Sequence, residues 1–214
     1  MDYADARRRM VDGQIRPNKV TDPRLLDALR DLPRERFLPP ALRARAYVDE
    51  DVPLPGGRAL MEPMVLARLV QLLAPRPGCR ALVVGAGTGY GAAVLARIGA
   101  AVTAVEEDAA LAAIAREAFE EFLPPAAVRV ADRLPSDGEL FDAVLVEGGV
   151  PAVPDRVSGL LAEGGRLAAV VGGGRLNGTG VLGQRLGGAF TVTPVFDCAV
   201  AALPAFATPA RFVF

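Results

Sequence analysis

The sequence contains no histidine among its 214 residues. Without imidazole, the chain cannot build a Ser-His-Asp triad, a Cys-His nucleophile pair or a zinc site with histidine ligands. It has only two cysteines, Cys79 and Cys198, which are far apart and lack the spacing of a metal site. We therefore expect no metal ion and no structural disulfide, and any catalysis must depend on carboxylates, hydroxyls, backbone groups or a reactive cofactor.

The chain also lacks an excess of either charge, since 24 Lys and Arg residues stand against 25 Asp and Glu residues. No basic stripe indicates nucleic acid, and Arg7–Arg9 is better explained as a solvent-exposed helix face. The uncharged stretch 81–96 is too short and too rich in glycine to span a bilayer. No signal peptide is evident at the polar N-terminus. We expect a soluble, cytoplasmic monomer without nucleic-acid or membrane partners.

The first 75 residues carry mainly helix signals. Residues 4–15 form one predicted helix. In "TDPRLLDALRDL" a second helix is predicted, with Thr21 or Asp22 as its cap and Pro23 in its first turn. "EPMVLARLVQLLAP" predicts a third helix, which Pro75 ends. Residues 1–75 are therefore predicted to be a helical N-terminal extension.

From residue 76 onward, apolar strand signals alternate with helix signals. This alternation is typical of an α/β fold with a mainly parallel sheet and right-handed crossovers. "VPDRVSGLLAEGG" predicts a short helix with a glycine end. After Gly174 the helix signals stop, and an antiparallel edge is predicted for "GVLGQRL", "AFTVTPVF" and "ARFVF".

The stretch "VVGAGTGYG" places a glycine-rich turn between a predicted strand and a predicted helix, where α/β sheets bind cofactors. A dinucleotide fingerprint requires G-x-G-x-x-G or A. Counted from Gly85, its sixth position is Tyr90; counted from Gly87, the pattern fits formally but begins late in the turn. The denser G-x-G-x-G spacing resembles motif I of the S-adenosylmethionine-dependent methyltransferases.

Two acids stand at predicted strand ends beyond this turn. Glu106 follows the glycines by about 20 residues, where a carboxylate accepts hydrogen bonds from ribose hydroxyls. This acid suits either NAD or S-adenosylmethionine, and a solvated helix start is the alternative. Glu107 or Asp108 is the expected helix cap. Asp132 can accept from an adenine amino group, a second feature of the methyltransferase resemblance, although a simple turn also explains it.

Segments along nearly the whole chain resemble the protein-L-isoaspartate O-methyltransferase family. They are "MVDGQI", "PRERF", "AY" and "PLP" in the first part, and "VVGAGTGYGAAVLA", "FDAVLVEGG", "LLAEGGRLAAVVG" and "RFV" in the second. The resemblance implies a Rossmann-like, seven-stranded methyltransferase sheet with helices on both faces. Residues 1–75 would supply the helical extension and substrate loop, and residues 76–214 the cofactor-binding core, in one compact unit.

In that family, the methyl group of S-adenosylmethionine passes to the free α-carboxylate of an isoaspartyl residue in a protein or peptide. A carboxylate is already a nucleophile and the sulfonium is a strong electrophile, so the enzyme mainly aligns the two and excludes water. No histidine is needed. The expected cofactor-binding residues are Gly85, Ala86, Gly87, Thr88, Tyr90, Glu106, Glu107, Asp132, Arg133 and Glu147.

The chain departs from the family where substrate would bind. The family segment G-x-x-I-S-Q-P has Met61 at its serine position and Glu62 at its glutamine position here. Met61 cannot donate a hydrogen bond to a carboxylate, and Glu62 would repel one unless it is protonated or paired with Arg58. Glu147 stands where the family has threonine and small residues, and no proline follows the final Phe-Val.

Three interpretations remain open at this point. The chain repairs isoaspartyl residues with a modified pocket, or methylates a cationic or hydroxyl-bearing acceptor attracted by Glu62 and Glu147, or binds the cofactor without catalysis. Met61 and Glu62 are the candidate catalytic positions. Their structural alternative is a methionine that fills the core and a glutamate at the start of a helix.

Overall fold

The computed structural model describes residues 2–136, 138–172 and 177–206. Within these ranges, no helix is long and apolar enough to cross a membrane. The predicted edge segment "ARFVF" lies outside the described residues.

The N-terminal extension is helical, as predicted. Helix α1 spans Tyr3–Met10 and continues through a π-helical turn at Val11–Ile15, and α2 spans Pro23–Asp31. The Asp22 carboxylate accepts from the backbone N–H of Arg24 and thereby caps α2. Helix α3 spans Pro63–Leu73, and its first residue is proline. A 3-10 turn at Arg16–Asn18 lies between the π-helical turn and α2. Short 3-10 turns and a two-stranded ribbon connect α2 to α3, at Arg34–Phe37, Pro40–Arg45, β1 (Val52–Pro53), Pro55–Gly57 and β2 (Ala59–Leu60).

A seven-stranded sheet forms the rest of the fold, in the order β5-β4-β3-β6-β7-β8-β9. The first five strands in this order are parallel and the last two are antiparallel. Strand bounds are β3 Arg80–Val84, β4 Ala101–Val105, β5 Val128–Ala131, β6 Phe141–Val150, β7 Leu161–Gly172, β8 Gly178–Leu186 and β9 Ala189–Cys198. Between the strands lie α4 (Tyr90–Arg97), α5 (Ala109–Phe122) and α6 (Asp155–Ser158), and a last 3-10 turn spans Pro204–Phe206.

The sequence prediction around α6 was too long. The helix has only four residues, and the segment from Leu161 onward already belongs to β7. The Leu160 carbonyl accepts from Phe141 N at 2.8 Å, so pairing with β6 takes over directly after the helical turn. Gly164 and Gly165, which were expected to end this helix, lie inside β7.

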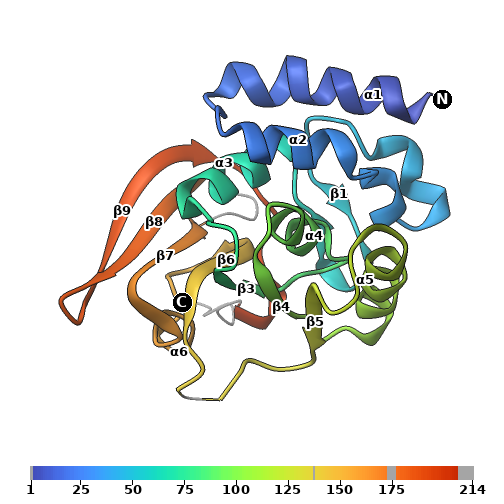
Figure 1. The fold of residues 1–214 in the computed structure, drawn as a ribbon. Helices are drawn as coiled ribbons and strands as arrows, with labels where there is room; N and C mark the ends of the chain where they lie inside the picture. The colour runs from blue at the N-terminus through green and yellow to red at the C-terminus, as the bar shows by residue number, and fades with distance from the viewer. Residues whose placement is uncertain (1, 137, 173–176, 207–214) are drawn as a thin grey trace, which may run out of the picture.

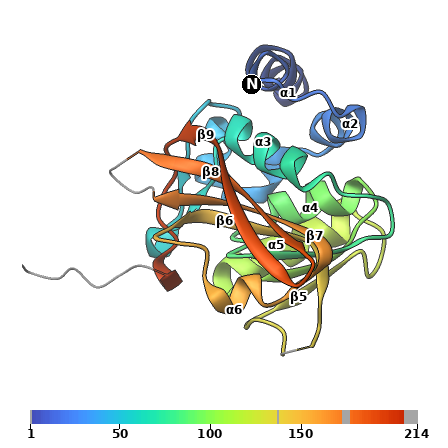
Figure 2. The same cartoon turned by 90° about the vertical axis from the view of Figure 1, so that its left-hand side faces the viewer.

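The two faces of the sheet are covered unequally. Alternate residues of β3 separate them: Ala81 and Val83 join the core under α1 to α5, while Leu82 and Val84 join a smaller core with Val157 of α6. Figure 1 shows α1 and α2 beyond α3, and Figure 2 shows α6 alone on the opposite side. One hydrophobic core thus joins the N-terminal extension to the sheet.

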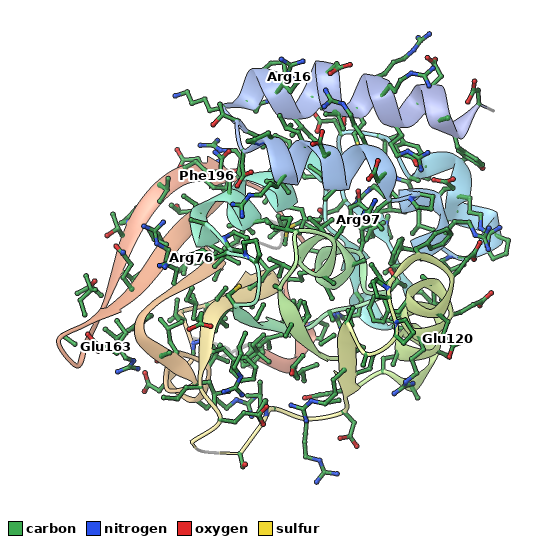
Figure 3. All side chains as sticks on the ribbon, in the orientation of Figure 1. Arg16, Arg76, Arg97, Glu120, Glu163 and Phe196 are labelled. Carbon is green, nitrogen blue, oxygen red and sulfur yellow. The ribbon has the colours of Figure 1, made fainter. Side chains whose placement is uncertain are left out.

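Side chains at two junctions fix the extension and the antiparallel edge. Arg97 of α4 pairs with Asp31 of α2, with 2.6 Å between Nη2 and Oδ2. Phe196 of β9 lies beneath Arg68 of α3, whose guanidinium carbon is 3.8 Å from the ring centroid. Arg97 and Phe196 are both labelled in Figure 3, next to the helices that they join. The first contact links α4 to α2, and the second links α3 to β9.

Candidate active site

The glycine turn lies directly after β3, as predicted. Gly85, Gly87 and Gly89 have φ values of +70°, +57° and +90°, a region that residues with a Cβ rarely adopt. A Cβ at Gly89 would lie 2.5 Å from Phe119 Cζ, so α5 also requires glycine there. The Ala86 N–H donates to the Val105 carbonyl at 3.0 Å and holds the turn against the end of β4.

Glu106 is the buried carboxylate of this turn. It follows β4, and its side chain is 1% exposed. Its Oε2 accepts from Gly87 N at 2.6 Å, and its Oε1 accepts from Asp108 N at 3.0 Å. The sequence placed this acid correctly beside the glycines. It also serves a structural purpose, because it ties the turn to the start of α5.

Arg58 completes the partners of Glu106. Its Nη1 donates to Glu106 Oε1 and its Nη2 donates to the Gly85 carbonyl, both at 2.7 Å. A pair with Arg58 was one predicted way to neutralise Glu62, but Arg58 pairs with Glu106 instead. The partners are 48 residues apart in sequence, so no local pattern pointed to this ion pair.

The chain's own C-terminal segment covers the turn. Leu203 N donates to the Gly149 carbonyl and Gly149 N donates to the Ala201 carbonyl, each at 2.8 Å. The Ala201 N–H donates to Asp51 Oδ2 at 2.6 Å. A Cβ at Gly85 would lie only 2.7 Å from Leu203 Cδ1, so the leucine rests on the turn itself. Residues 200–206 were not expected at the site from sequence.

The cavity left beside Glu106 has a volume of about 30 Å³. Small-molecule sites usually offer roughly 300 Å³ or more, so a nucleoside needs Arg58 and the C-terminal segment to move aside. Glu107, a predicted cofactor-binding residue, is exposed and lines this cavity. Among the other lining residues are Leu134, Arg156, Leu203 and Phe206, none of which the sequence had suggested.

Three predicted cofactor residues lie elsewhere. Asp132 and Arg133 are exposed side chains that pair with each other at 3.2 Å and do not line the cavity. The Tyr90 side chain is fully buried in the core, with its ring 5.2 Å from that of Phe37 and 4.8 Å from the Arg34 guanidinium carbon. The Tyr90 ring therefore points toward the N-terminal extension, and a contact of Tyr90 with the cofactor through its backbone stays a prediction. Burial raises its pKa to about 12.

The loop before α3 carries the two candidate acceptor positions. Met61 is 3% exposed, and its carbonyl accepts from Arg34 Nη2 at 2.6 Å, so it is a core residue at the edge of the site. Glu62 precedes α3, and its N–H donates to Asp51 Oδ1 at 2.8 Å. Desolvation and the neighbouring Asp51 and Asp49 raise the pKa of Glu62 to about 7.

Glu147 lies in β6 and is buried. Its Oε1 has no hydrogen-bond partner among the described residues, and a Cβ at Gly91 would overlap this oxygen. Burial raises the pKa of Glu147 to about 8, against the opposing effect of Arg58 and Arg34. Glu147 is therefore mostly neutral at pH 7 and offers a hydrogen-bond donor. The expectation that it attracts a cation requires an ionised side chain, which this environment disfavours.

No group of three or more potential metal ligands occurs within residues 2–136, 138–172 and 177–206. The candidate site thus consists of the glycine turn, Glu106 and the loop before α3.

The model of the family "Protein-L-isoaspartate(D-aspartate) O-methyltransferase (PCMT)" matches residues 6–192. The chain belongs to this family. It is 40% identical to a protein-L-isoaspartate O-methyltransferase of Methylorubrum extorquens over 80% of this chain and 76% of the relative. It is 34% identical to one from Koribacter versatilis over 92% of this chain and 89% of the relative.

The solved PCMT of Plasmodium falciparum, in complex with S-adenosyl-L-homocysteine, matches with a TM-score of 0.75 at 19% identity, over 92% of this chain and 97% of that one. This likeness supports the fold. Family membership confirms the predicted resemblance: the chain is an S-adenosylmethionine-dependent protein carboxyl O-methyltransferase with the predicted α/β, seven-stranded sheet.

The residues at the turn fit this cofactor. The left-handed glycines have no side chain to block a cofactor once Leu203 and Arg58 move aside, and Glu106 presents a buried carboxylate beside them. Thr88 Oγ1 is buried and has no partner among the described residues, so it is a further polar atom at the turn. Arg58 now donates hydrogen bonds to Glu106 and to the Gly85 carbonyl. The hydroxyls and the ammonium group of the cofactor are also hydrogen-bond donors and could bind the same oxygens.

Proposed function

We propose that the chain transfers a methyl group from S-adenosylmethionine to the free α-carboxylate of isoaspartyl residues in proteins and peptides. The observation that carries this proposal is the glycine turn joined to the buried Glu106, within a chain whose family match spans residues 6–192. When bound, the cofactor supplies an electrophilic methyl group on its sulfonium.

The chain's residues would bind and orient the two reactants. We assign ribose recognition to Glu106, whose carboxylate is fixed by backbone N–H groups. Glu107 lines the same cavity. The remaining proposed cofactor contacts are Gly85, Ala86, Gly87, Thr88, Asp132 and Arg133. Asp132 and Arg133 now pair with each other, so this pair must break before either side chain can contact the adenine.

The acceptor would approach along the loop at residues 56–63. Glu62 is the group there that most affects a carboxylate acceptor, since like charge in a partly desolvated site is costly. Its pKa of about 7 means that Glu62 is mostly protonated below neutrality and mostly charged above it. We therefore propose that isoaspartyl acceptors bind better on the acidic side of pH 7.

A second candidate is methyl transfer to an acceptor bearing an ammonium or hydroxyl group. Its support is the acidity of the acceptor side, where Asp51 and Glu147 line one small cavity and Glu62 stands next to Asp51. An ammonium acceptor would first give a proton to a carboxylate such as Glu62 or Asp51 and then attack as the neutral amine, whereas a hydroxyl would lose its proton to such a carboxylate as the new bond to carbon forms. The experiment below separates the two candidates.

The partners and setting are also proposals. The balanced charge of 24 basic and 25 acidic residues supports a protein or peptide partner rather than nucleic acid or a membrane. We propose a monomer that acts in the cytoplasm. Light scattering behind a sizing column measures the mass, and a mass twice that of the 22.3 kDa chain contradicts the monomer.

The deciding assay uses methyl-labelled cofactor with an isoaspartyl peptide and its normal-aspartyl twin. A carboxyl methyl ester releases labelled methanol in base, whereas methylated amines and ethers do not. Base-labile label on the isoaspartyl peptide alone supports the proposal. Base-stable label on another acceptor supports the second candidate, and normal cofactor binding without turnover supports a non-catalytic role.

A further inference from the structure

Arg58 lies between the cofactor side and the acceptor side of the site. Its side chain is only 11% exposed, and it lines both the cavity beside Glu106 and a second, smaller one that includes Asp51, Met61 and Glu147. Among the described residues that line the second cavity, Arg58 is the sole cation. Its position thus gives one guanidinium access to both reactants.

The present partners of Arg58 are the groups that a bound cofactor would use. Glu106 Oε1 and the Gly85 carbonyl each accept one guanidinium N–H at 2.7 Å. Ribose hydroxyls and the ammonium group of the methionine part are hydrogen-bond donors of the same kind. Glu106 Oε1 already accepts from both Arg58 and the Asp108 N–H, so a cofactor donor can bind this oxygen only in place of Arg58, and the two compete.

The acceptor side lacks donors for a carboxylate. Met61 replaces the hydroxyl that the family pattern offers, and its side chain is buried. Glu62 and Asp51 carry or can carry negative charge, and each makes the site less favourable for an anion. An isoaspartyl α-carboxylate therefore needs a cation here, and guanidinium binds carboxylates in a two-point geometry.

We propose that Arg58 is the acceptor-specificity residue of this enzyme and that it changes partners during binding. In the free protein it pairs with Glu106. When the cofactor takes Glu106, the released guanidinium binds the α-carboxylate of the isoaspartyl acceptor. This inference rests on the proposed function. It couples the two sites, because the cofactor frees the group that the acceptor requires.

Calorimetry with S-adenosylhomocysteine and an isoaspartyl peptide tests both parts. For Arg58→Ala we expect S-adenosylhomocysteine to bind about threefold to tenfold more tightly, since no internal competitor remains. Peptide binding to the S-adenosylhomocysteine-saturated variant should weaken at least about tenfold, as expected for loss of a charged hydrogen-bonded pair. The wild type should bind the peptide about tenfold more tightly with S-adenosylhomocysteine than without it.

Arg97→Ala serves as the matched control, because Arg97 forms an exposed ion pair with Asp31 on α2. It should change neither affinity. Arg58→Lys keeps the charge with a single-point contact and should fall between wild type and alanine for the peptide. This variant also tests the inference if Arg58→Ala melts at a much lower temperature.

Two results overturn the inference. One is weaker S-adenosylhomocysteine binding by Arg58→Ala, which makes Arg58 a cofactor ligand rather than a competitor. The other is unchanged peptide affinity in Arg58→Ala. If the saturated wild type binds no isoaspartyl peptide, the acceptor part falls together with the proposed function, while tighter S-adenosylhomocysteine binding by Arg58→Ala still identifies the competition alone.

Discussion

Glu106 and Glu147 are two buried glutamates, one directly after β4 and one in β6, the strands that flank β3, and their surroundings differ sharply. Glu106 accepts two backbone N–H groups and pairs with Arg58. Glu147 has an oxygen without a partner among the described residues, and burial raises its pKa to about 8. Backbone N–H groups and Arg58 thus hold the Glu106 carboxylate in place, whereas burial favours the neutral form of Glu147.

This difference divides the site between its two substrates. The β4 side has the features of a cofactor site: its glycines are left-handed, and the Gly87 N–H holds the Glu106 carboxylate in place. The β6 side has acids whose charge is suppressed, next to the loop where the chain departs from its family. The proposed cofactor side and the proposed acceptor side thus meet at Arg58, which lines both cavities.

Glu147→Gln should have the largest effect, on the free energy of unfolding. A folded-state pKa of about 8 against an ordinary value of 4.5 means that the folded protein holds the extra proton between these values, so stability falls as pH rises through this window. Removing the ionisable group should raise stability near pH 8 by roughly 2–4 kcal/mol and flatten this dependence.

Urea unfolding of both forms from about pH 5 to pH 8.5 measures this. Glu106→Gln is the matched comparison, and it should lower stability because Arg58 loses its buried partner. Equal stability changes for the two glutamine variants would contradict the contrast between the two carboxylates.

Glu106→Ala should come next, with weaker binding of S-adenosylmethionine and S-adenosylhomocysteine by roughly 1–3 kcal/mol, the range for a hydrogen bond to a charged group. Glu107→Ala changes the next residue, which is exposed, and should matter much less. Calorimetry with both nucleosides and with NAD is the measurement. Similar losses in the two variants, or binding of NAD alone, would show that the β4 side is misassigned.

The double change Met61→Ser with Glu62→Gln should raise isoaspartyl methylation about tenfold, or roughly 1.4 kcal/mol of barrier. It adds a hydroxyl donor and removes a group that repels the acceptor. Cofactor affinity should stay constant, because Glu106 and the glycines are unchanged. Initial rates at saturating cofactor decide the matter, with a thermal melt as control because Met61 is a core residue. A wild-type rate equal to that of the double variant argues against control by this loop.

The smallest expected effect concerns pH. Because the pKa of Glu62 is about 7, its charge appears as pH rises through neutrality. The KM for an isoaspartyl peptide should therefore rise about twofold to fivefold between pH 6 and pH 8, and Glu62→Gln should flatten that rise. A wild-type KM that is independent of pH would remove Glu62 from acceptor recognition.

Local patterns predicted most of the fold. The apolar runs located the strands, the glycine turn fell directly after β3, and Asp22 and Asp108 cap α2 and α5. Glu106 was found because, in such folds, the acid that binds ribose follows the glycine turn by about 20 residues. The β7 boundary was missed because pairing with β6 overrode a helix-like pattern.

The unpredicted parts of the site depend on contacts between residues distant in sequence. Arg58 meets Glu106 across 48 positions, and Asp51 accepts from Ala201 across 150. Tyr90 belongs to the glycine motif in sequence, yet its ring is buried under the extension. Composition and spacing carry no information on such pairs, so these contacts over the glycine turn emerged only from the structure.

Bisubstrate kinetics of Glu106→Gln and Glu147→Gln test the division of the site most directly. We predict that Glu106→Gln raises the KM for S-adenosylmethionine about tenfold or more and leaves the KM for the isoaspartyl peptide nearly unchanged. Glu147→Gln should change the peptide KM and leave the cofactor KM constant. Variants that shift both KM values alike would contradict it, since the two carboxylates would then serve one common site.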